Sequence, residues 1–84
     1  METFIGTIIL FPNTYVPRGW AACNGQELSI MQNQALFSIL GTTYGGNGTT
    51  AFALPNLPTV KDVDGKGESQ YIICLYGIYP QRDW

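Results

Sequence analysis

The 84-residue chain contains no histidine and few charged residues of either sign. Charged residues make up 12% of the chain, about half the fraction usual in globular proteins. Without histidine, the chain lacks the commonest general base and the commonest metal ligand. With a net charge of −2 and no run of Lys or Arg, it also lacks the basic surface of a nucleic-acid-binding domain. We therefore expect no metal, no cofactor and no nucleic-acid partner.

Long apolar runs and cysteines are scarce as well. No apolar run approaches the roughly 20 residues that a membrane span needs. The apolar run at residues 4–11 follows Glu2 rather than a positively charged region, so it indicates a strand and not a signal peptide. Cys23 and Cys74 are too few for a disulfide framework or a metal site. Each lies in a strand-like segment, which favours free, buried thiols over a disulfide.

Groups that could act together in catalysis are also missing. Ser29 and Ser38 have no histidine and no obvious lysine to activate a hydroxyl, and the six acidic residues are scattered. The glycine-rich residues 42–50 predict a turn or Ω-loop, because a phosphate cradle needs a helix directly after the glycines. Residues 62–68 have a passing likeness to a calcium loop, but further carboxylates are missing. A solvated hairpin tip is favoured there, and we expect no enzyme.

The chain is instead rich in apolar side chains, which make up 45% of it. A chain of this length makes one domain and buries only about 60–65% of its unfolded surface. Because charges are few, much of the remaining surface has to be uncharged or apolar, which favours an oligomer. We expect a single domain over residues 1–84.

Residues 27–46 carry the signals of a helix with both ends marked. Ser29 is a preferred N-cap residue, and Gln32, three positions later, can complete a capping box. Gly41 is the expected stop, because glycine takes the left-handed conformation at little cost. The helix is therefore predicted over residues 30–40.

This predicted helix is apolar on nearly all sides. Ile30 and Phe37 point away from the main apolar face and leave only a narrow polar strip. The main face carries Met31, Ala35, Leu36, Ile39 and Leu40. A surface helix in a monomer normally has a wide polar face. Either the rest of the chain wraps this helix or a neighbouring chain covers it.

Five segments have the composition of β-strands. They are residues 4–11, 20–23, 26–28, 50–54 and 71–79. The first and the last are apolar on both alternating faces, so we expect both to be covered and to pair antiparallel, with the termini near opposite ends of one ladder. Asn24 and Gly25 favour a type I′ hairpin between the second and third segments. Trp20, just before that turn, is expected to anchor the core near Cys23 and the helix.

The aromatic residues exceed what the core of so small a domain needs. They fit a core with a subunit interface, and they also fit a platform on which sugar rings stack. The candidate interface residues are Ile30, Phe37, Tyr76, Tyr79 and Trp84. The candidate glycan-binding residues are Tyr15, Arg18, Tyr44 and Asn47, on the loops at residues 13–18 and 43–49.

Several motifs together resemble a known family. They are FIGTIILF, PRGWAACNGQELSI, QNQALFSILGTTYGG and FALPNLP. Over residues 3–59 the chain resembles the phage tail collar domain, which is also seen in microcystin-dependent-type bacterial proteins. The closing YIICLYGIYP is similar to the C-terminal strand of short members of that family.

The resemblance implies an α+β fold in which a small antiparallel sheet packs around one short central helix. It implies a domain of tail fibres and related appendages that tends to form trimers and has no catalytic residues. Longer members carry a glycine-rich, often histidine-containing insertion before the last strand. Here that region is reduced to residues 60–70 and contains no histidine.

Two functional hypotheses follow. In the first, the chain is a non-enzymatic structural module of a phage tail fibre, a tail-like device or an extracellular filament, and it self-assembles through its apolar strands and termini. Its partners are then copies of itself, as a trimer or a filament, and other tail or appendage proteins. In the second, it is an adhesin domain that binds a cell-surface glycan. Both place the chain in the virion or an extracellular appendage.

Overall fold

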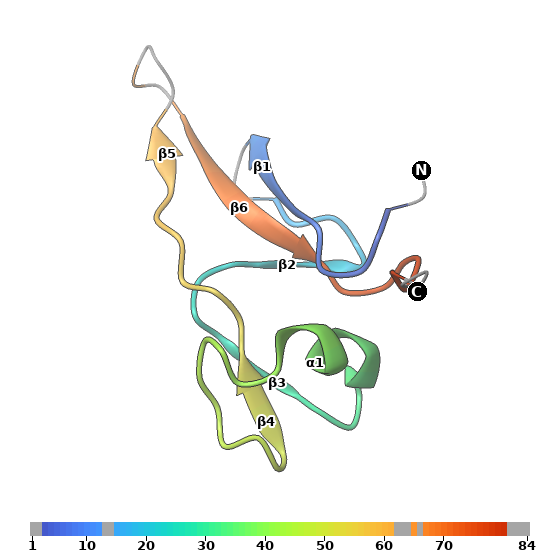
Figure 1. Ribbon diagram of the computed structural model, residues 1–84. Helices are drawn as coiled ribbons and strands as arrows, with labels where there is room; N and C mark the ends of the chain where they lie inside the picture. Colours follow the sequence, from blue (N-terminus) through green and yellow to red (C-terminus); the bar gives the residue numbers. More distant parts are fainter. Residues whose placement is uncertain (1–2, 13–14, 62–64, 66, 81–84) are drawn as a thin grey trace.

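The computed structural model describes residues 3–12, 15–61, 65 and 67–80. These residues form six strands and one helix, which confirms the α+β class (Figure 1). In chain order they are β1 (Ile8–Pro12), β2 (Trp20–Ala22), β3 (Glu27–Ser29), α1 (Gln34–Leu40), β4 (Ala51–Ala53), β5 (Val60–Lys61) and β6 (Glu68–Cys74). The strands form two antiparallel sheets, one with β1, β6, β2 and β5 and one with β3 and β4.

The larger sheet is built around β6. On one side β6 pairs with β1, from Ile8 opposite Ile73 to Pro12 opposite Ser69. On its other side lie β2 and, further along, β5. The antiparallel pairing expected between the first and last apolar segments is therefore confirmed. The first strand is shorter than predicted, because the chain turns at Gly6, whose φ of 90° is left-handed.

The expected position of the chain ends is wrong. Antiparallel pairing brings the start of the first strand beside the end of the last one, and not to the opposite end of the ladder. The described ends accordingly lie together, where the Ile78 N–H donates to the Thr3 carbonyl at 2.8 Å. Phe4 and Ile78 form an isolated parallel bridge at the same place.

The hairpin expected at Asn24 and Gly25 is also wrong, since β2 pairs with β6 and β3 pairs with β4. The turn at Asn24 and Gly25 takes the chain from β2 in the larger sheet to β3 in the smaller one, and the connection from β4 to β5 leads back to the larger sheet (Figure 1). Asn24 bridges Asn56, and the Gly25 N–H donates to the Pro55 carbonyl at 3.2 Å. Pairing with distant strands therefore replaces the local hairpin.

The helix begins later than predicted and ends where predicted. Ser29 is the last residue of β3, so its backbone is held in a strand and residues 30–32 form a turn. Asn33 takes the N-cap position of α1, although its side chain makes no capping bond there. Gly41 ends the helix with φ 58°, and its N–H donates to the Phe37 carbonyl at 2.7 Å.

The core lies between α1 and strands of both sheets. Its fully buried side chains are Leu36, Phe52, Leu54 and Ile73. Ile72 and Cys74 are also fully buried, but on the other face of β6. The Phe37 ring packs on Phe52 with the ring centroids 5.3 Å apart. Of the predicted main face of the helix, Leu36 is fully buried, whereas Met31, in the turn before α1, is 81% exposed.

Both cysteines are free and buried, as the sequence favours. Cys74 lies at the end of β6, where its thiol donates to the Tyr76 carbonyl at 3.2 Å. Burial raises the pKa of the Cys23 thiol above its ordinary value of 9.0. Both features protect the thiols while the chain stays folded.

We therefore expect the native protein to react slowly with a thiol reagent and the urea-unfolded protein to react quickly at both cysteines. A reducing agent should leave the melting temperature unchanged, since a disulfide would be worth about 2–4 kcal/mol. Because the pKa of Cys23 is raised in the folded state, its contribution to stability is present below pH 9 and is lost as the pH rises further. Rapid reaction of the native protein would contradict this.

Candidate functional site

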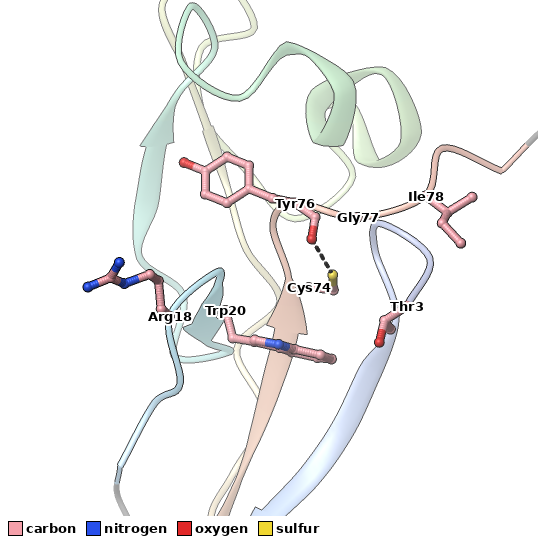
Figure 2. A pocket seen from close by; sticks show the side chains of 7 residues that line it. All are labelled: Thr3, Arg18, Trp20, Cys74, Tyr76, Gly77 and Ile78. Atoms are coloured by element: carbon pink, nitrogen blue, oxygen red, sulfur yellow. Dashed lines mark hydrogen bonds between the residues drawn. The ribbon is translucent and has the colours of Figure 1, made fainter. Parts of the chain in front are cut away.

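A pocket of about 390 Å³ lies where the end of β6 meets β2 and the start of the chain. Its volume is within the range of roughly 300–1,000 Å³ that small-molecule sites occupy. It is lined by Thr3, Arg18, Trp20, Cys74, Tyr76, Gly77 and Ile78 (Figure 2). In Figure 2 Arg18 and Tyr76 lie on one side and Thr3 and Ile78 on the other, with the Trp20 ring between them.

One wall is made by a close approach of two backbone segments. A Cβ atom on Gly77 would lie 2.1 Å from the Thr3 carbonyl oxygen, so a larger residue would push the segments apart. Glycine therefore permits the hydrogen bond from the Ile78 N–H to Thr3. The Ile5 N–H in turn donates to the Ile78 carbonyl at 2.8 Å.

The opposite wall comes from β2 and the turn before it. Trp20 lies opposite Cys74 in the sheet, and the Leu75 N–H donates to the Gly19 carbonyl at 2.8 Å. Alternate residues of a strand point to opposite faces, so Trp20 faces away from Ala21 and Cys23, which lie in the core. Trp20 is therefore a half-buried wall of the pocket and not the core anchor that the sequence predicts.

The pocket is positively charged at one side. Arg18 is exposed at its rim, and none of the described lining residues is acidic. Of the described acids, Glu68 accepts a hydrogen bond from the Thr59 hydroxyl at the far end of β6. Glu27 begins β3 in the smaller sheet. Among the described residues, no acidic side chain therefore lies at the pocket beside Arg18.

A second feature of the surface is the free edge of β1, which we call the β1 edge (residues 8–12). The Cys74 N–H donates to the Thr7 carbonyl at 2.9 Å, so Thr7 faces β6. Because this direction alternates along an antiparallel strand, Ile8 and Leu10 turn their N–H and C=O groups away from β6. Within the described structure no strand pairs with that side of β1.

The β1 edge is also apolar. Ile8, Ile9 and Leu10 are 38%, 39% and 44% exposed, although they stand in the strand that the sequence predicts to be covered on both faces. The prediction that both faces of this strand are covered is wrong for a single copy of the chain, because β1 is an edge strand of its sheet. The strand carries no charged side chain, which is the usual protection of such an edge.

Residues 6–59 match the phage tail collar domain. The chain belongs to this family. The match covers more than half of the chain, from the turn before β1 to the prolines after β4, and confirms the resemblance seen in the sequence. No curated protein matches the chain. Membership makes it a structural, virion-associated domain of the phage-tail type.

The candidate interface residues of this collar domain have different surroundings. Ile30 and Phe37 are half-buried against the core, so much of their surface is used within the chain. The Tyr79 and Ser38 hydroxyls are 2.6 Å apart, which ties the C-terminal segment to α1. Tyr76 lies at the pocket, and Trp84 lies outside the described residues.

The candidate glycan-binding residues fall in two places. Tyr15 and Arg18 belong to the connection between β1 and β2, and Tyr44 and Asn47 to the loop between α1 and β4 (Figure 1). The Asn47 side-chain carbonyl accepts the N–H groups of Thr49, Thr50 and Ala51 at 2.8, 2.9 and 3.1 Å. Asn47 thus shapes its own loop, and the structure places Arg18 with Trp20 and Tyr76 instead.

The metal site and the membrane span that the sequence argues against can be examined in the described residues alone. Among these residues, no three His, Cys, Asp or Glu side chains lie close enough together to hold a metal ion. The loop with a passing likeness to a calcium site lies largely outside the described residues. Among the described residues, no helix is long and apolar enough to span a membrane.

Proposed function

We propose that this collar domain is a non-enzymatic structural subunit that assembles with copies of itself through the β1 edge. The observation that carries the proposal is the run of three half-exposed apolar residues, Ile8, Ile9 and Leu10, on a strand that has no described strand paired with its outer side. Large exposed apolar patches and unprotected sheet edges normally mark an interface. Membership of a family of structural tail domains supports the same reading.

Copies of the chain are the partner that fits this surface best. The β1 edge is uncharged, so two or three copies of it can approach one another without repulsion. Around a closed symmetry axis the same apolar residues of each copy meet, and burying them removes the exposed surface from water. We favour a trimer, the state that the family resemblance implies, over an open filament.

Leu10 is the most exposed of the three residues, so Leu10→Lys is the sharpest test. A lysine buried there without a partner charge should weaken assembly by about 100-fold or more. Sedimentation velocity over a range of concentrations should show the wild type as a trimer and Leu10→Lys as a folded monomer. Circular dichroism checks that the variant is folded.

Met31→Lys is the matched control, because it makes a similar change at an exposed apolar residue outside β1. It should sediment as the wild type does. A wild type that stays monomeric at all concentrations would overturn the proposal, and so would equal weakening by both variants. Deletion of residues 81–84 in the same experiment asks whether the terminus contributes, as the sequence suggests.

A further inference from the structure

The pocket beside β6 combines features that the structural role does not require. Tyr76 is 65% exposed, yet it stands at the mouth of a pocket and not in the core. The half-buried indole of Trp20 also lines the pocket, and in Figure 2 it extends in the opposite direction to the Tyr76 ring. The exposed Tyr76 ring and the half-buried Trp20 indole offer aromatic area to a ring-shaped ligand at little cost in side-chain entropy.

Two of the polar side chains of the pocket, Arg18 and Trp20, are donors only, whereas the Thr3 and Tyr76 hydroxyls can both donate and accept. Arg18 carries five N–H donors and no acceptor, the Trp20 indole carries a donor only, and none of the described lining residues is acidic. The Tyr76 carbonyl already accepts the Cys74 thiol, and the Thr3 carbonyl already accepts the Ile78 N–H. A ligand that fits this arrangement presents acceptors, above all negatively charged ones.

We propose that this pocket binds an acidic sugar, a pyranose ring that carries a carboxylate. The apolar C–H face of the ring packs on the aromatic side chains of Trp20 and Tyr76. The carboxylate protrudes toward Arg18, whose planar guanidinium matches a carboxylate with two parallel hydrogen bonds. In Figure 2 Arg18 and Tyr76 extend to the same side, so the charged end of the ligand lies at the open rim.

The size of the pocket and its construction agree with one sugar unit as the ligand. Its volume of about 390 Å³ lies near the lower end of the range for small-molecule sites. The close backbone approach of Gly77 and Thr3 closes the side of the pocket that carries Ile78, away from Arg18. A single ring that makes these few contacts binds weakly, with a dissociation constant on the order of 1 mM. Several copies in one assembly would strengthen attachment to a surface that displays many such sugars.

The test is a titration followed by the ¹⁵N–¹H resonance of the Trp20 indole, assigned with a Trp20→Phe variant. Sodium glucuronate should shift this resonance to saturation, whereas glucose should bind at least 5-fold more weakly. Sodium acetate and inorganic phosphate, at equal ionic strength, should not reproduce the shift. Equal effects of acetate or phosphate would show an anion site without sugar recognition and would overturn the proposal.

Variants assign the contacts. Arg18→Gln should remove the preference for glucuronate over glucose and leave weak binding of both. Tyr76→Ala should weaken both sugars, and Tyr15→Ala is its control, because Tyr15 is also 65% exposed but does not line the pocket. Absence of any saturable shift, or equal loss with Tyr15→Ala, would overturn the proposal. Sedimentation of the same samples shows independently whether the chain assembles, so a failure of one proposal is distinguishable from a failure of the other.

Discussion

Replacing Phe52 by alanine should lower the free energy of unfolding by about 3–5 kcal/mol, the range seen when a fully buried aromatic ring is removed. Phe52 stands in the middle of β4, is fully buried, and packs against Phe37 of the helix. Its removal leaves a cavity between α1 and the small sheet. An 84-residue domain is stable by only about 4–13 kcal/mol, so this one change removes a large share of the total.

Urea unfolding followed by circular dichroism measures the effect, at a concentration low enough to keep the chain monomeric. Phe4→Ala is the matched control, because it removes the same ring from a residue that is 54% exposed. The control should cost less than about 1 kcal/mol. If Phe52→Ala does not fold, Phe52→Leu should give a smaller loss that can be measured. Equal losses for Phe52→Ala and Phe4→Ala would contradict the core described above.

The sequence predicts well those features that depend on neighbouring residues. Gly41 ends the helix because a left-handed residue is needed there, and glycine takes that conformation whatever surrounds it. One long-range feature was predicted as well, the pairing of β1 with β6, because these two segments alone are apolar on both alternating faces. Both thiols are free and buried, as expected of unpaired cysteines, which behave as small apolar residues.

The other features that depend on distant partners were not predictable. Asn24 and Gly25 have the composition of a hairpin turn, but β2 gains more by pairing with β6 and β3 by pairing with β4. Ser29 is a good N-cap residue, yet its backbone is used by a strand, which moves the start of the helix to Gln34. In each case tertiary pairing overrides a local preference.

The same reason explains why the pocket was not predicted. Its residues come from the start of the chain, from β2 and from the segment after β6. The sequence does indicate an excess of aromatic residues, but only the register of β2 against β6 shows that Trp20 turns away from the core. A signal was present in Gly77, which lies between large side chains in a segment that otherwise reads as a strand.

Gly46 shows a similar close approach, and its backbone geometry leads to the second large prediction. Gly46 has a φ of 94°, and a Cβ atom there would lie 2.4 Å from the Phe52 Cα and 2.6 Å from the Ala51 carbonyl oxygen. These are backbone atoms of β4, so the clash cannot be relieved by turning a side chain. Hydrogen bonds from Ala53 to Gly45 and from Gly48 to Ala51, at 3.0 and 3.1 Å, hold the loop in this place.

Gly46→Ala should therefore lower the free energy of unfolding by about 2–5 kcal/mol, which adds roughly 1–2 for the left-handed conformation to roughly 1–3 for the clash. Gly65→Ala separates the two causes, because Gly65 has a φ of 73° but no atom of the described residues lies within 4 Å of the added Cβ. It should cost only the conformational part. Urea unfolding of both variants gives the comparison. If Gly46→Ala is no less stable than Gly65→Ala, the loop does not pack on β4 as closely as the structure shows, and the position of Phe52 beneath it is wrong as well.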